Sequence, residues 1–283
     1  MISQQQLKAF LQEREIGVNA PEVLIELPEG PIFHVLIEGR WQALHQWQRA
    51  CDLVAVTGLW PMIVNSREVA TTSLLFEQIQ TGVAATEFLH QARAMNALHL
   101  LAKRLRRCLP IEEPEKLPEE VPMEVFCAPE PGRYLPQIEE IMGTWPDLFD
   151  PESYDPEDFL KPSERLEVPK GQKTVSLCFF PVEQSWQVPA LLRYGGWNVC
   201  PLPVEHSSIH LSWHKRYGAE IVCLSGDTIE CFVPHPPTTQ QECRKLALEH
   251  FAYCSDIVRQ EHGSLEALAT DLLRNRIWYF WWD

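Results

Sequence analysis

The amino-acid sequence predicts an α+β protein with two folded parts, an N-terminal α+β domain at residues 1–109 and a C-terminal domain at residues 173–283. The first supporting observation is composition, because 45% hydrophobic and 22% charged residues are typical of a globular chain. The second is periodicity, since short segments of alternating polarity are mixed with segments of helical period. The third is the stretch at residues 110–172, which contains 12 of the 23 prolines and separates the two parts.

The N-terminal part begins with a helical pattern, in which Leu7, Phe10 and Leu11 fall on one face. Two strands at residues 22–27 and 32–37 are expected next, joined by a turn that contains proline and glycine. The rest of this part is predicted to hold a short helix, two buried strand segments and a helical stretch, at residues 41–51, 53–56, 61–64 and 71–109.

The segment 110–172 is acidic as well as rich in proline, with 17 of the 39 acidic residues of the chain and only 5 of the 24 basic ones. Such a composition favours an extended connector between folded parts. A short helix is expected near residues 134–142. The connector also carries large apolar side chains, which favour a segment lying across a domain surface over a free tether: Trp145, Leu148, Phe149, Tyr154 and Phe159.

The C-terminal part shows the element order β-α-β-β-α-β. Gly218 is expected to end its longest helix, and Gly226-Asp227 to form the two-residue loop of a hairpin. The predicted elements are a strand, a helical leg in two pieces, two strands, a second helical leg in two pieces and a final strand, at residues 174–180, 189–194, 204–217, 220–225, 228–233, 239–253, 264–275 and 277–282. This order is that of a ferredoxin-like fold, which predicts a four-stranded sheet with helices on one face.

The last seven residues predict a docked strand rather than a frayed terminus, because aromatic and β-branched residues dominate them. Side chains alternate along a strand, so the tail has two apolar faces. One face holds Trp278, Phe280 and Trp282, and the other holds Ile277, Tyr279 and Trp281. The second face is expected to be covered, either by the N-terminal part or by a second copy of the chain in a homodimer.

The nine cysteines are expected to be reduced and mostly buried, because their number is odd and no C-x-x-C motif occurs. The hairpin loop places Cys223 and Cys231 on opposite faces of the sheet, which excludes a disulfide between them.

The N-terminus lacks a basic and apolar leader, and no run of about 18 apolar residues occurs, so a cytoplasmic location without membrane contact is expected. The folded parts carry no basic stripe, so no nucleic-acid partner is expected.

Several motifs of the C-terminal part occur in a fixed order: Gly195-Gly196-Trp197-Asn198, Trp213-His214-Lys215-Arg216-Tyr217-Gly218-Ala219, Pro236-Pro237, His250-Phe251-Ala252-Tyr253-Cys254-Ser255-Asp256 and Trp278-Tyr279-Phe280-Trp281-Trp282-Asp283. This set resembles the bacterial family called domain of unknown function 4253, over roughly residues 174–283. Thr57-Gly58-Leu59-Trp60-Pro61 resembles a segment found upstream in longer members. The family has no assigned activity, so the resemblance implies no catalytic or ligand-binding residues.

A histidine stripe is the first candidate for chemistry. His206, His210 and His214 are spaced four residues apart on one predicted helix, and an i, i+4 pair can bind zinc or nickel. No acidic partner completes a known metal motif, and His214 lies too far from His206 to share one ion easily. Solvated surface histidines are therefore the preferred interpretation, and no cofactor is expected.

The second candidate is Cys254, because His250 and Asp256 lie within one helical turn and supply residue types used in nucleophilic catalysis. No G-x-S-x-G or Q-A-C-x-G motif accompanies them. The alternative is a buried Cys254 with Asp256 capping the turn after a helix.

Gly195-Gly196 lacks the lysine and the hydroxyl residue of a phosphate-binding loop. The pair instead predicts a turn with positive φ, in which Asn198 bonds the local backbone.

The absence of a catalytic signature and the number of tryptophans favour a non-enzymatic cytoplasmic protein that binds another protein. An immunity or antitoxin-like role is one form of this hypothesis. The candidate binding residues are Trp197, Asn198, Trp213 and Trp281. The alternative is a small-molecule hydrolase or metal-assisted enzyme with a pocket near Trp197, Trp213 and Cys254.

Overall fold

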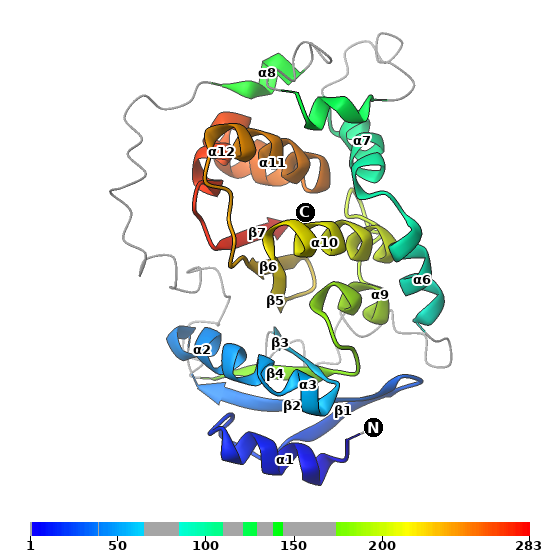
Figure 1. Cartoon of the computed structure of the whole chain (residues 1–283), viewed down its shortest axis with the longest axis vertical. Coiled ribbons are helices and arrows are strands. Elements are labelled where there is room, and N and C mark those ends of the chain that lie inside the picture. Colours follow the sequence, from blue (N-terminus) through cyan, green and yellow to red (C-terminus); the bar gives the residue numbers. More distant parts are fainter. Residues whose placement is uncertain (1, 39, 65–84, 110–120, 129–137, 144–173) are drawn as a thin grey trace.

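The computed structural model describes residues 2–38, 40–64, 85–109, 121–128, 138–143 and 174–283. These residues have a mixed α+β fold, as the sequence predicts, and strands from both halves of the chain form one sheet (Figure 1). The strands are β1 (Glu22–Leu27), β2 (Gly30–Glu38), β3 (Trp60–Val64), β4 (Thr174–Phe180), β5 (Glu220–Leu224), β6 (Thr228–Phe232) and β7 (Ile277–Trp281). Their order in the sheet is β1-β2-β4-β3-β5-β6-β7.

The strands of the C-terminal part do not form a sheet of their own. β3 lies between β4 and β5, antiparallel to β4 and parallel to β5. The predicted element order β-α-β-β-α-β is present, but the ferredoxin-like strand arrangement is not. The physical reason is that all five residues of β3 are buried, so this strand needs a hydrogen-bonding partner along each edge.

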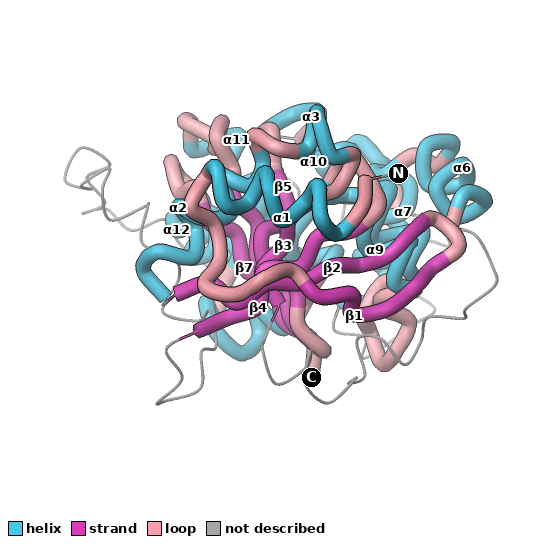
Figure 2. The backbone as a smooth tube through the Cα atoms, turned by 90° about the horizontal axis from the view of Figure 1, so that it is seen from below, coloured by secondary structure: helices cyan, strands magenta, loops and turns pink. Residues whose placement is uncertain are grey.

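Helices surround the strands, which twist through the centre of the molecule (Figure 2). They are α1 (Gln4–Glu13), α2 (Arg40–Cys51), α3 (Val54–Thr57), α6 (Thr86–Ala94), α7 (Ala97–Cys108), α8 (Glu139–Met142), α9 (Val188–Leu192), α10 (Pro203–Tyr217), α11 (Gln240–Tyr253), α12 (Leu265–Leu272), the 3₁₀-helices η2 (Met123–Phe126) and η6 (Ser185–Gln187), and the π-helix η7 (Ile257–His262). α10 ends at Gly218, as predicted, with a φ of 66°. α3 replaces a predicted strand segment, because Gly58 at a φ of 67° closes a helical turn there.

None of the helices in the described ranges is long and apolar enough to cross a membrane.

Helices pack on both faces of the sheet. On one face, His210 of α10 brings its Nδ1 to 3.8 Å from the Sγ of Cys231 in β6. On the other face, the Trp47 ring of α2 lies 6.0 Å from the Phe232 ring, between centroids. The N-terminal part covers the second face at Phe232, which is one of the two covers that the sequence predicts.

The tail forms β7, and its side chains alternate in burial as predicted. The face toward α10 and α11 is at most 1% exposed and holds Trp278, Phe280 and Trp282. The opposite face is half-buried and holds Ile277, Tyr279 and Trp281. The first face is therefore part of the core, whereas the second is covered only in part.

The predicted register of the hairpin is confirmed beside its two-residue loop, and the predicted absence of a disulfide between Cys223 and Cys231 is confirmed as well. Cys223 lies opposite Glu230, which is the predicted register. A bulge at Val222 then shifts the pairing by one residue, so that Ile221 lies opposite Cys231. All nine cysteines are free thiols, and Cys223 and Cys231 are not joined.

Two short pieces of the acidic connector are described, and both pack on the core. In η2, Val125 and Phe126 are 0% and 2% exposed and contact the region between α7 and α11. Ile138, just before α8, is 0% exposed, and a Cβ on Gly143 would lie 2.6 Å from the Ser264 side chain. These pieces lie across the helices, as expected for a draped segment. The predicted domain boundaries stay predictions, and outside the described residues lie the anchors Trp145, Leu148, Phe149, Tyr154 and Phe159.

Candidate functional site

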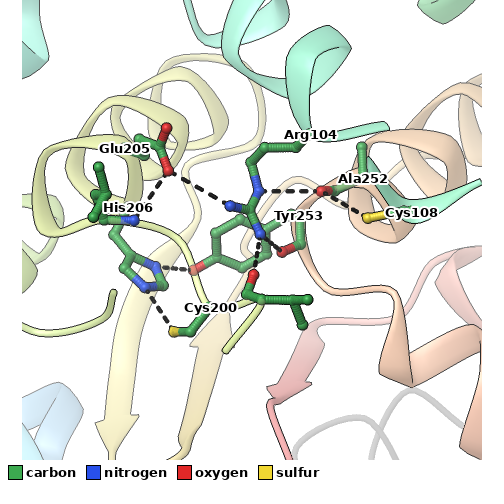
Figure 3. A network of polar contacts seen from close by, with 9 residues as sticks. Arg104, Cys108, Cys200, Glu205, His206, Ala252 and Tyr253 are labelled. Carbon is green, nitrogen blue, oxygen red and sulfur yellow. Dashed lines mark hydrogen bonds and ion pairs between the residues drawn. The ribbon is translucent and has the colours of Figure 1, made fainter. Parts of the chain in front are cut away.

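The most polar part of the buried core lies between α10 and α11. Helical spacing puts His206 and His210 one turn apart on the face of α10 that contacts α11. Tyr253, at the end of α11, places its hydroxyl between the imidazoles, 2.6 Å from His206 Nδ1 and 2.8 Å from His210 Nε2. All three side chains are at most 1% exposed. Figure 3 shows the His206 imidazole beside the Tyr253 hydroxyl.

A thiol lies at each end of this arrangement. Cys200 Sγ is 3.3 Å from His206 Nε2 (Figure 3), and Cys231 Sγ is 3.8 Å from His210 Nδ1. Each neutral thiol, imidazole or phenol can donate one hydrogen and accept another, so one direction of donation satisfies every contact. We call these five residues the histidine–tyrosine chain: Cys200, His206, Tyr253, His210 and Cys231.

Burial sets the charge of the histidine–tyrosine chain. Desolvation lowers the pKa of His210 to about 3 and lowers the pKa of His206 well below its ordinary value. Desolvation also raises the pKa of Tyr253 and of the thiols Cys200 and Cys231. All five groups are therefore uncharged at neutral pH.

The histidine stripe is not the solvated surface that the sequence predicts. His206 and His210 are buried because they lie on the apolar face of α10, and the Tyr253 hydroxyl occupies the space between their imidazoles. His214 faces another element, with its Nδ1 2.9 Å from Glu220 Oε1, and this contact raises the pKa of His214. Within the described ranges, no three His, Cys, Asp or Glu side chains are grouped in a way that could hold a metal ion.

A buried arginine of α7 joins this region to the N-terminal part of the chain. Arg104 is 7% exposed, and its Nε donates to Ala252 O at 3.2 Å. Its Nη2 donates to Tyr253 O at 3.1 Å and to Val199 O at 2.5 Å (Figure 3). Its Nη1 lies 3.5 Å from Glu205 Oε2. Carbonyls at the end of a helix lack intrahelical partners, so the guanidinium completes α11 and also fixes the loop before α10.

The loop between α9 and α10 requires a glycine beside the imidazole. Gly195 has a φ of 104°, and a Cβ there would lie 2.1 Å from Pro201 O and 2.7 Å from His206 Nε2. This confirms the predicted turn with positive φ. Asn198 was predicted to bond the local backbone, but its Nδ2 donates to the main-chain oxygen of Asp283 at 2.7 Å. The loop is thereby joined to residue 283.

The loop between α9 and α10 also carries exposed side chains. Val199 and Leu202 are 49% and 52% exposed. Trp197 is half-buried, and Asn198 and Asp283 are exposed. We call these residues the terminal surface: Trp197, Asn198, Val199, Leu202 and Asp283.

The four predicted binding residues lie in three different places. Trp197 and Asn198 belong to the terminal surface. Trp213 is 0% exposed, and its Nε1 donates to Glu249 Oε2 at 2.9 Å, so it is a core residue. Trp281 is half-buried on the opposite face of β7.

The side chains of Cys254, His250 and Asp256 face different partners. Cys254 is 0% exposed, and its thiol donates to Trp281 O at 2.8 Å. His250 is 1% exposed, with its ring 4.7 Å from the Trp278 ring. Asp256 Oδ2 lies 3.5 Å from the backbone N of the final residue. Burial raises the pKa of Cys254 to about 12 and lowers the pKa of His250. This geometry fits a buried structural Cys254 better than a nucleophile.

Arg104, Cys200 and Tyr253 are site residues that were not predicted from the sequence. A signal for Arg104 was present, because it lies between Leu101 and Leu105 on the apolar face of α7. A charge in such a stripe indicates a buried partner, since an unpaired buried charge is very costly. Cys200 and Tyr253 had no comparable local signal, because their shared partner His206 comes from another element.

Comparisons with known proteins agree with the motifs of the C-terminal part. Residues 176–283 match the family model described as Domain of unknown function (DUF4253). Neither the curated proteins nor the solved structures contain a match to the chain. The matched residues include β5 to β7 and all five members of the histidine–tyrosine chain. Residues 176–283 of this chain are therefore similar to the DUF4253 family.

Proposed function

We propose that this is a cytoplasmic binding protein that recognises another protein through the terminal surface. The observation that carries the proposal is the presence of exposed apolar side chains on a firmly held backbone. Val199 and Leu202 are 49% and 52% exposed, beside the half-buried ring of Trp197. Aromatic and aliphatic anchors of this kind supply much of the affinity in protein interfaces.

The loop that carries the terminal surface is fixed at three points. Arg104 Nη2 donates to Val199 O, Cys200 contacts His206 in the core, and Asn198 holds the main-chain oxygen of residue 283. A surface that is ordered before binding loses less conformational entropy when its partner arrives. These contacts support recognition with little backbone rearrangement.

The alternative, a hydrolase or metal-assisted enzyme around Trp213 and Cys254, has less support. Both side chains are 0% exposed, and their polar atoms already bond Glu249 Oε2 and Trp281 O. An immunity or antitoxin-like role is the specific form of binding that we put forward, in which the partner is a toxic protein and binding neutralises it.

The test uses the protein encoded by the adjacent gene as the trial partner. Both chains are co-expressed, complex formation is measured by size-exclusion chromatography with light scattering, and toxicity is measured by growth. The double variant Val199→Glu, Leu202→Glu places two charges in the proposed contact. We expect it to weaken the complex by about 100-fold or more and to abolish protection.

Val56→Glu is the matched control, because Val56 is 61% exposed on α3, away from the terminal surface (Figure 1). The control and the double variant should both melt like the wild type, since the changed side chains are exposed. A complex of unchanged affinity in the double variant would exclude the terminal surface as the contact. A homodimer that the double variant loses would instead identify the partner as a second copy of the chain.

A further inference from the structure

Cys200 and His206 form a thiol–imidazole pair, with Cys200 Sγ 3.3 Å from His206 Nε2. We propose that Cys200 accepts an acyl group from an activated ester or thioester, with His206 as its general base and Tyr253 as a positioning residue. This reaction goes beyond protein binding and does not depend on it.

The three side chains have the arrangement of a nucleophile, a base and a group that orients the base. Cys200 Sγ is 3.3 Å from His206 Nε2, and His206 Nδ1 is 2.6 Å from the Tyr253 hydroxyl. A nucleophile within reach of a base, with the base oriented by a third group, recurs on many unrelated folds. Tyr253 also contacts His210 at 2.8 Å, and the proposed reaction uses the tautomer in which His206 Nδ1 donates to Tyr253 and His206 Nε2 accepts from Cys200.

Cys200 has the shorter of the two contacts between a thiol and an imidazole, 3.3 Å against 3.8 Å for Cys231. The thiol of Cys254 donates to the Trp281 carbonyl, and Cys231 is 0% exposed at the inner end of the histidine–tyrosine chain. Cys200 is 5% exposed, and the next residue outward, Val199, is 49% exposed. The proposed reaction requires a small electrophile to reach Cys200 from the side of the terminal surface, where Val199 is exposed.

Two neighbouring groups favour negative charge on the sulfur as it develops. Burial raises the pKa of Cys200 and keeps the thiol protonated at rest; Cys254 and Glu205 add to this rise, whereas the Arg104 guanidinium and the Gly196 backbone oppose it. Proton removal must therefore accompany attack instead of preceding it. This is general-base catalysis, in which the base is close to the proton that it takes.

In the proposed transfer, the Cys200 sulfur attacks the carbonyl carbon and forms an S–C bond while its proton moves to His206 Nε2. The π electrons of the carbonyl move to oxygen, which gives a tetrahedral intermediate. When the carbonyl re-forms, the C–O or C–S bond of the donor breaks. The leaving alcohol or thiol takes the proton from His206. The products are S-acyl Cys200 and neutral His206, so no oxidant or reductant is consumed.

The test uses p-nitrophenyl acetate with the full-length chain carrying Cys127→Ser, which removes an exposed thiol. Absorbance measures the release of p-nitrophenolate, and peptide mass spectrometry locates the acetyl group. We expect one equivalent of p-nitrophenolate per chain and acetylation of Cys200. Cys200→Ala should abolish this burst, and His206→Gln should slow it by about 100-fold or more.

Tyr253→Phe separates a positioning role from a structural one, because it removes only the hydroxyl. We expect the rate to fall by about tenfold and its pH profile to change. With a positioned base, the rate should vary little between about pH 6 and pH 8, whereas a thiol that reacts through its free thiolate gains about tenfold per pH unit. Thermal melting of each variant distinguishes a lost reaction from a lost fold.

Acetylation of other residues with Cys200 unmodified would overturn the proposal. An unchanged rate and pH profile in Tyr253→Phe would also overturn the positioning role and leave the hydrogen bonds as structural contacts. If His206→Gln fails to fold, the site of acetylation in the Cys127→Ser protein and the Tyr253→Phe profile still decide the question.

Discussion

The tail strand allows a sharp test of the packing, because neighbouring residues differ in burial. Phe280 is 0% exposed, with its ring 4.8 Å from the Tyr253 ring and 5.3 Å from the Trp213 ring. Trp281, the next residue, is half-buried on the opposite face of β7. Replacing Phe280 with alanine should therefore destabilise the protein more than replacing Trp281, although tryptophan is the larger side chain.

The expected magnitudes follow from buried area. An aromatic side chain buries roughly 150–250 Å², which at about 25 cal/mol per Å² is on the order of 4–6 kcal/mol, an upper bound because the unfolded chain already hides some area. Core Phe→Ala changes cost about 3–5 kcal/mol, so we expect about 4 kcal/mol for Phe280→Ala. For the half-buried Trp281→Ala we expect about 1–2 kcal/mol.

Urea unfolding followed by far-UV circular dichroism measures both variants. With an m-value of about 2–3 kcal/mol per M, a loss of about 4 kcal/mol lowers the midpoint by roughly 1.3–2 M. The midpoint for Trp281→Ala should move by less than about half of that. Equal shifts, or a larger shift for Trp281→Ala, would show that the assigned faces of β7 are wrong.

Three further predictions concern the buried polar groups. Acid should destabilise the protein, because the folded-state pKa values of His206 and His210 lie below the unfolded value of about 6.5. The free energy of unfolding should fall as the pH drops below about 6.5, by up to about 1.4 kcal/mol per pH unit for each histidine. Urea midpoints measured at about pH 7 and pH 5 check this. Arg104→Met should cost about 3–5 kcal/mol by thermal melting, because several buried acceptors lose their donor, whereas the same change at an exposed arginine of α7 should have little effect. Gly195→Ala should lower the melting temperature far more than Gly263→Ala, since both have positive φ but only the first has atoms in the space of the new Cβ.

Local patterns predicted the elements whose residues are close in sequence. The alternation of β7 and the register of Cys223 with Glu230 followed from residue types and a two-residue loop. The position of β3 did not follow, because the pairing of Ile63 with Cys223 depends on burial shared by distant segments. No short period in the sequence contains that information, so a four-stranded ferredoxin-like sheet was the simplest arrangement of the C-terminal elements.

The candidate site was harder to predict than the fold. His206 and His210 were assigned to the surface because no acidic partner completed a metal motif, although they share a helical stripe with Ile209 and Trp213, which are both 0% exposed. That stripe was a usable signal of burial. The contact with Tyr253 was not predictable, because helical spacing orders residues along one helix but does not say which side chain of another helix lies between them.

The buried polar contacts link parts of the chain that the sequence pattern separates. Arg104 belongs to α7, yet it completes the end of α11 and holds the Val199 carbonyl of the terminal surface. β3 likewise lies outside the matched residues 176–283 and still pairs with both β4 and β5. A buried carbonyl without a donor costs about 1–3 kcal/mol, and a strand edge without its partner leaves several such groups. The shape of the terminal surface therefore depends on residues outside the matched segment, and the binding that we propose at that surface would be coupled to the folding of both halves of the chain.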